Sequence, residues 1–171
     1  MALKHVVLLV LAWLGAMTCA AASEPVSEQS VRAAMVFNFI KFTEWPEAAN
    51  GDSEIVICTS SGDPAQIAAM VALNDRRVRG KRLAVVAFDR HIDCDVIYVD
   101  SRQRWNDIRE SRRGGHAMTM GGHAGFAANG GMVEILLQDG KPRFDINLPE
   151  AKRAGLRFYP QLLQLARRIL E

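Results

Sequence analysis

Catalytic signatures are absent from this sequence of 171 residues. It contains no G-x-S-x-G, H-E-x-x-H or C-x-x-C motif, and no pair of acidic residues stands at a spacing typical of general acid–base catalysis. The formal net charge is only +2, so charge balance does not indicate nucleic-acid binding. The sequence therefore indicates neither an enzyme nor a nucleic-acid-binding protein, and we expect no cofactor and no bound metal ion.

Two groups of residues resemble binding motifs, but a structural interpretation is preferred for each. One group could be metal ligands: Asp89, His91, Asp93 and Asp95. Alternate residues on a short extended stretch rarely converge on one ion, so the structural interpretation is preferred. The glycine-rich segment 121–131 lacks the lysine and hydroxyl of a phosphate-binding loop, and we interpret it as a flexible turn. His116 and His123 are expected to be solvent-exposed loop residues.

No apolar run reaches the length of a membrane-spanning helix, and the longest run lies at the N-terminus. Lys4 and His5 precede the apolar run Val6–Leu14, and small residues follow up to Ser23, which is the order of a secretory signal peptide. The run has about half the ~20 residues that a membrane-spanning helix needs, so a retained anchor is disfavoured. Lipid attachment at Cys19 is disfavoured too, because threonine precedes it. We predict a signal peptide over residues 1–22 and one exported domain over residues 23–171.

The first half of this domain alternates predicted strands and helices. Helices are predicted at 31–42, at 64–73 and from 100 to 113, and strands at 54–58, 82–88 and 94–99. Asp63 and Pro64 form a typical helix start, since an aspartate caps free N–H groups and proline suits the first turn. The alternation predicts a small α/β sheet with crossover connections.

The second half predicts a hairpin and a terminal helix. After a short strand at 116–120 and the glycine-rich segment, strands 132–137 and 143–148 should pair across Asp139-Gly140. Residues 149–170 are predicted to be helical with an interruption at 155–160, and the last part has a leucine-rich face. The predicted fold is thus α/β: a single compact domain, a small sheet with helices, and a C-terminal β-hairpin followed by a helix.

Cysteines are scarce. If Cys19 is removed, Cys58 and Cys94 remain in an oxidising compartment and permit one bridge, with two buried free thiols as the alternative. Cys58 ends one predicted strand and Cys94 begins another. Parallel neighbours would place them at opposite ends of the sheet, so a bridge requires antiparallel or staggered strands.

Aromatic and basic side chains form two further groups. The aromatic residues of the first helix and its end could belong to the core, to a docking surface or to a ligand pocket: Phe37, Phe39, Phe42 and Trp45. The basic residues gather on the helix after residue 100, where a solvated face is preferred to an anion site: Arg102, Arg104, Arg109, Arg112 and Arg113.

Several strings, taken in order, resemble the YfiR family of small exported regulators. They are FIKFTEWP at 39–46, IC at 57–58, CDVIYV at 94–99, the loop 125–132, RFDINL at 143–148, AGL at 154–156 and the segment 162–168. The resemblance spans nearly the whole exported domain. It implies a periplasmic protein, often a homodimer, that restrains a membrane-bound diguanylate cyclase by binding its periplasmic part. Cyclic di-GMP output and biofilm formation would fall, and an outer-membrane lipoprotein could sequester the regulator.

The resemblance also implies roles for particular residues. Cys58 and Cys94 match a disulfide linked to redox control, and Val133, Asp145 and Arg153 match positions of partner contact, although the family residue at 133 is aromatic. A second cysteine pair found in some relatives is missing here. We therefore predict a negative regulator of a cyclase, with an exported sensor of a small hydrophobic or aromatic ligand as the alternative.

Overall fold

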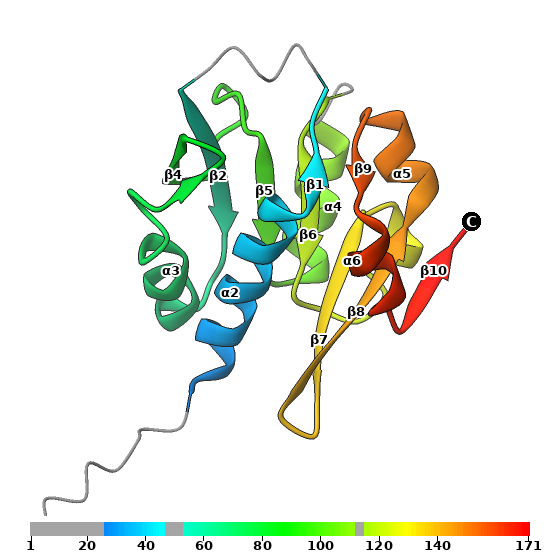
Figure 1. Cartoon of the computed structure of the whole chain (residues 1–171). Coiled ribbons are helices and arrows are strands. Elements are labelled where there is room, and N and C mark those ends of the chain that lie inside the picture. Colours follow the sequence, from blue (N-terminus) through cyan, green and yellow to red (C-terminus); the bar gives the residue numbers. More distant parts are fainter. Residues whose placement is uncertain (1–25, 47–52, 112–114) are drawn as a thin grey trace, which may run out of the picture.

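Apolar residues on both faces of the central strands place the sheet between two helical layers. The computed structural model describes residues 26–46, 53–111 and 115–171, so the predicted signal peptide and Cys19 lie outside the described residues. Eight of the described strands form one sheet in the order β10-β8-β7-β6-β5-β2-β4-β3 (Figure 1). The mixed α/β architecture confirms the predicted fold class.

The central strands run parallel, and the sheet edges are mixed. The parallel neighbours are, in order across the sheet, β4, β2, β5, β6 and β7. On either side of them, β8 is antiparallel to β7 and β3 is antiparallel to β4. The bounds are β2 (Glu54–Ser60), β3 (Arg77–Val78), β4 (Lys81–Ala87), β5 (Val96–Val99), β6 (Met118–Gly121), β7 (Val133–Gln138) and β8 (Lys141–Asn147). A separate ribbon pairs β1 (Thr43–Glu44) with β9 (Arg157–Phe158).

Helix α3 begins where the sequence predicts, whereas α2 begins at Glu28, before its predicted start at Val31. Asp63 accepts a hydrogen bond from the Ala65 N–H at 2.9 Å and starts α3 (Pro64–Val71). Ser27 caps α2 (Glu28–Lys41) in the same way through the Ser30 N–H. The other helices are α4 (Arg102–Ser111), the short 3-10 helix η2 (Ala127–Asn129), α5 (Leu148–Arg153) and α6 (Pro160–Gln164).

Two hydrophobic clusters lie on the two faces of the sheet. Because side chains alternate along a strand, Val96 and Tyr98 of β5 pack with α2, while Ile97 and Val99 pack with Trp105 of α4. Figure 1 shows α2 crossing the front of the sheet and α4 behind it. The aromatic-rich α2 is therefore mainly a core helix.

The end of the chain differs from the predicted terminal helix. The expected interruption is present, but α6 ends at Gln164 and the last residues form strand β10 (Arg168–Leu170), parallel to β8. Leucines at helical spacing suggested a longer helix. Pairing with β8 and the contacts of Arg167 and Arg168 with a buried carboxylate override that local pattern.

The glycine-rich segment packs tightly and is not the flexible turn that its composition suggested. Phe126 is fully buried, its ring centroid 4.7 Å from that of Trp105. A Cβ atom on Gly121 or on Gly131 would overlap the Phe126 ring. The Trp105 indole N–H donates a hydrogen bond to the Asn129 carbonyl at 2.9 Å and so attaches η2 to α4. These two glycines therefore permit close approach to one aromatic ring.

Gly131→Ala should destabilise the fold by about 1–3 kcal/mol, because the added methyl group would displace the buried Phe126 ring. Urea denaturation followed by circular dichroism measures this loss. Gly62→Ala is the control, since its Cβ would meet only the movable end of the Arg104 side chain, at 3.1 Å. Equal unfolding midpoints for the two variants would contradict the packing argument.

Candidate functional site

A disulfide joins Cys58 and Cys94, whose Cα atoms are 5.8 Å apart. β2 and β5 are indeed parallel neighbours, with Cys58 level with Ile97. The bridge forms because Cys94 precedes β5 and lies in the connection after β4, where it packs in the same hydrophobic cluster as Cys58. The predicted strand 94–99 therefore wrongly included Cys94, since β5 begins at Val96. The bridge fastens this connection to the middle of the sheet.

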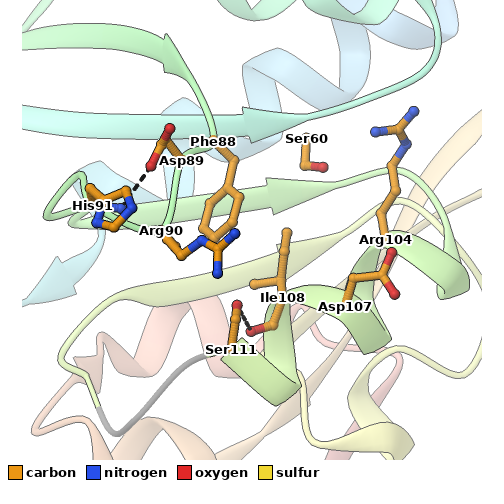
Figure 2. Close-up of a pocket in the computed structure, with 9 residues that line it drawn as sticks. All are labelled: Ser60, Phe88, Asp89, Arg90, His91, Arg104, Asp107, Ile108 and Ser111. Carbon is orange, nitrogen blue, oxygen red and sulfur yellow. Dashed lines mark hydrogen bonds between the residues drawn. The ribbon is translucent and has the colours of Figure 1, made fainter.

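A cleft of 530 Å³ opens beside this connection, and we name it the β4–α4 cleft. Figure 2 shows its residues: Ser60 from the end of β2, Phe88, Asp89, Arg90 and His91 from the connection, and Arg104, Asp107, Ile108 and Ser111 from α4. A second hollow of 320 Å³ includes Cys94 itself, which is 9% exposed. The disulfide therefore lies close to the surface.

The alternating polar residues near Cys94 do not converge. Asp95 accepts a hydrogen bond from the Val56 N–H at 2.7 Å, and Asp89 accepts one from the His91 N–H at 2.8 Å. Across residues 26–46, 53–111 and 115–171, no group of three or more His, Cys, Asp or Glu side chains is placed to hold a metal ion. These carboxylates order the backbone around the connection.

Hydrogen bonds within the protein join the segments that follow β2 and β5 at the crevice between the carboxyl ends of these strands. This is the switch point of the sheet, because the chain passes from β2 to β4 on one side and then to β5 on the other, and such crevices often bind ligands. Here Asp100 accepts hydrogen bonds from the Ser61 hydroxyl at 2.6 Å and the Gly62 N–H at 2.7 Å. Arg104 lies 3.6 Å from the other Asp100 oxygen.

The basic residues of α4 contact other parts of the chain. Arg102 donates to the Ala124 carbonyl at 3.4 Å, and Arg109 donates to the Asn129 carbonyl at 3.3 Å. Arg112 and Arg113, which were predicted to extend this group, lie outside the described residues. The described arginines thus connect α4 to the glycine-rich loop and to the switch point.

Two buried carboxylates face each other on β7 and β8. Glu134 and Asp145 are register partners and are 2% and 0% exposed. Arg167 contacts both Asp145 oxygens at 2.8 and 2.7 Å, and Arg168 lies 2.9 Å from one of them. Glu134 accepts from the Ala127 N–H at 3.1 Å. We call these four charged residues the Asp145 charge cluster.

The arginines of this cluster control the ionisation of Asp145. Burial raises the pKa of the Asp145 carboxyl, but the hydrogen bonds and positive charges of Arg167 and Arg168 outweigh it, so the pKa lies below its usual range. Asp145 is therefore a negative charge inside the protein at neutral pH. The Asp145 charge is stabilised only while Arg167 and Arg168 stay beside it.

The three residues that the family resemblance linked to partner contact do not form one surface. Val133 is fully buried in the cluster beside α2, and Asp145 is fully buried with the two arginines. Arg153, at the end of α5, has a side chain that is 68% exposed and pairs with Glu150 at 2.8 Å. Of the three, Arg153 is the one that solvent reaches.

Arg153 borders a cleft of 560 Å³ between α4 and α5. Its floor contains Trp105, Thr119, Met132 and Ala154, which are almost completely buried. Arg109 and Glu150 also line it. This α4–α5 cleft combines an apolar floor with charged side chains, a combination suited to binding another molecule.

The aromatic residues of α2 do not line one pocket. Phe39 packs in the core against Phe144 and Phe158, with centroid distances of 5.1 and 5.8 Å, and Phe37 lies under the Arg76 guanidinium at 3.9 Å. Phe39 and Phe42 line a groove of 300 Å³ between α2 and α6, whereas Trp45 borders a different hollow. Leu165, which is 72% exposed, extends this apolar groove.

A family model described as YfiR/HmsC-like matches residues 29–167. The chain belongs to the YfiR/HmsC-like family. The match extends from the first turn of α2 to the residue before β10. No helix within the described parts of the chain is long and apolar enough to cross a membrane.

Two solved structures share the fold. One is a conserved domain protein from Vibrio cholerae O1 biovar eltor, with a TM-score of 0.52, 10% identity and 84% of this chain covered. The other is the ABC domain from Streptococcus pneumonia in complex with L-Trp, with a TM-score of 0.51, 10% identity and 68% coverage. This chain spans 60% and 56% of their lengths, and at such identity the likeness concerns the fold alone.

Replacing both bridging cysteines, Cys58→Ser with Cys94→Ser, should lower the free energy of unfolding by about 3–4 kcal/mol, because the unfolded chain loses a closed loop. Urea denaturation with and without dithiothreitol measures the effect. The double variant should not respond to the reductant. A wild-type midpoint that dithiothreitol leaves unchanged would contradict a stabilising bridge.

Asp145→Asn should cost about 2–4 kcal/mol of stability, because charge-assisted hydrogen bonds to two arginines are lost. The lowered pKa means that this stabilisation is present above the unfolded value of about 3.9 and is lost as pH falls through the folded value. Chemical denaturation should be measured from about pH 3 to about pH 8. The difference in the free energy of unfolding between the variant and wild type should be constant above about pH 5 and should shrink below about pH 4. The exposed Asp107→Asn should show neither effect.

Proposed function

We propose that this protein is a periplasmic negative regulator that binds the periplasmic part of a membrane diguanylate cyclase and lowers cyclic di-GMP signalling and biofilm formation. The family match over residues 29–167 carries the proposal. Export through a cleaved signal peptide is part of it. The regulator would favour a cyclase conformation in which the cytoplasmic catalytic domains do not pair productively.

The geometry supports binding by surface contacts. Arg153 is exposed beside the α4–α5 cleft, so it can contact a partner directly. Asp145 and Val133 are buried, so they would act as positioning residues: Asp145 holds β10 beside β8, and Val133 packs in the core. An outer-membrane lipoprotein that covers the same surface would compete with the cyclase for this regulator. The cyclase would then be released from inhibition.

The disulfide offers a second level of control. Cys94 is close to the surface, and reduction would release the connection between β4 and β5 from β2. Residues 130–134 contain no cysteine, so redox control in this protein would act through Cys58 and Cys94. The β4–α4 cleft and the hollow beside it would change shape when the connection moves.

A sensor of a small hydrophobic or aromatic ligand is the second candidate function. The groove between α2 and α6 favours it, because its lining is mostly apolar: Met35, Asn38, Phe39, Phe42, Phe144, Gln161, Leu162 and Leu165. Its volume of 300 Å³ is at the lower limit of common ligand pockets. Cyclase control remains the first proposal because the family match supports it.

Deleting the gene should raise cellular cyclic di-GMP, and expression of wild type should reverse the rise. Arg153→Glu should fail to reverse it and should weaken binding to the purified periplasmic part of the cyclase by about tenfold or more, because an exposed contact changes sign. Arg143→Glu, on the exposed end of β8, is the matched control and should behave as wild type. Cyclic di-GMP levels that do not respond to deletion would reject cyclase control.

A further inference from the structure

A hairpin at one edge of the sheet concentrates positive charge. β3 and β4 pair antiparallel around a turn at Arg79 and Gly80, and β3 is the outermost strand. We name residues 76–82 the basic hairpin. Within seven positions it carries five of the 21 Lys and Arg residues of the chain: Arg76, Arg77, Arg79, Lys81 and Arg82. The whole chain has a formal net charge of only +2, so positive charge is concentrated on this hairpin.

The acidic side chains beside the basic hairpin neutralise one of its arginines. Glu54 and Asp75 both form ion pairs with Arg82. The other three arginines are exposed and form no ion pair within residues 26–46, 53–111 and 115–171: Arg76, Arg77 and Arg79. Their positive charges are therefore not compensated within the described protein.

Neutral groups hold two of these arginines in place. Arg77 donates to the Gly80 carbonyl at 2.9 Å. The Arg76 guanidinium lies over the Phe37 ring, 3.9 Å from its centroid. Neither contact cancels a charge, so both guanidinium groups remain available to an anion.

The turn of the basic hairpin reaches the end of α2 and two aromatic rings. Arg79 donates to the Lys41 carbonyl at 2.9 Å and lies over the Tyr159 ring, 5.5 Å from its centroid. The Lys41 ammonium lies over the Phe42 ring at 5.3 Å. Lys41 is exposed and both rings are partly exposed. Aromatic side chains beside cations are typical of protein surfaces that meet the membrane–water interface.

We propose that the basic hairpin, with Lys41 beside it, binds the phosphate headgroups of an anionic membrane surface. Guanidinium groups bind phosphate oxygens through paired N–H donors. Each Lys or Arg near an anionic membrane strengthens binding about fivefold. An exported protein would meet such a surface at the inner membrane, beside the periplasmic part of the proposed cyclase partner.

Helix α3 adds exposed apolar side chains next to the basic hairpin. Ile67 and Val71, at the end of the helix, are 38% and 45% exposed. The Asn74 N–H donates to the Val71 carbonyl at 2.9 Å, and the Arg76 N–H donates to the Leu73 carbonyl at 3.2 Å. These turns keep the hairpin close to the helix end. Positive charge next to apolar side chains matches a membrane, where an anionic headgroup layer covers an apolar one, whereas an acidic protein would match the charge alone.

Cosedimentation with lipid vesicles tests this surface. Protein purified from the periplasm should bind vesicles of equal parts phosphatidylcholine and phosphatidylglycerol, should not bind phosphatidylcholine alone, and should dissociate as added salt screens the charges. Arg76→Gln with Arg77→Gln should weaken vesicle binding at least about tenfold, because two cations are lost. Arg76→Lys with Arg77→Lys keeps both charges and should retain most of the binding. Circular dichroism checks that each variant is folded.

The matched control removes the same charge from the other hairpin. Lys141→Gln with Arg143→Gln changes two exposed cations of β8 and should leave vesicle binding as in wild type. Equal losses in the two glutamine variants would overturn the proposal, since net charge alone would then explain binding. Wild type that binds soluble poly-L-glutamate but not the anionic vesicles would also overturn it, and would assign the basic hairpin to an acidic protein. These measurements use no cyclase, so their failure would leave cyclase control untouched.

Discussion

The buried carboxylate of Asp145 decides how the C-terminal third of the chain is arranged. It lies opposite Glu134 inside the protein, where two negative charges would be unfavourable without nearby cations. Arg167 and Arg168 supply those cations and hold β10 beside β8. Glu134 also accepts a hydrogen bond from Ala127, so the glycine-rich loop depends on the same charges. One ion-pair network therefore positions the sheet edge and the loop next to it.

Local signals in the sequence predicted most of the elements, because the chemistry that forms them is local. Asp63 caps a helix with its own side chain, and Asp139 and Gly140 adopt the positive φ angles, 51° and 69°, that a tight hairpin requires. Strand β10 was missed because Arg167 contacts a partner 22 residues away. Cys94 was misplaced because the start of β5 depends on register with β2. Long-range contacts of this kind leave no periodic pattern in the sequence.

The candidate site was less predictable than the fold. Sequence resemblance selected Val133, Asp145 and Arg153, and the structure separates them into two buried side chains and one exposed one. A buried charged residue can influence partner binding by holding a surface in place, and its replacement would then alter stability as well as binding. The α4–α5 cleft was not foreseen, because its lining comes from segments far apart along the chain.

The packing of Phe126 between Gly121 and Gly131 has a consequence for how this sequence can evolve. A larger residue in place of either glycine requires a smaller residue at position 126. A smaller residue at position 126 leaves a cavity unless one of the glycines is also replaced by a larger residue. Single changes are therefore unfavourable in both directions, while paired changes can conserve volume. Among related chains, the residues at these three places should vary together or not at all.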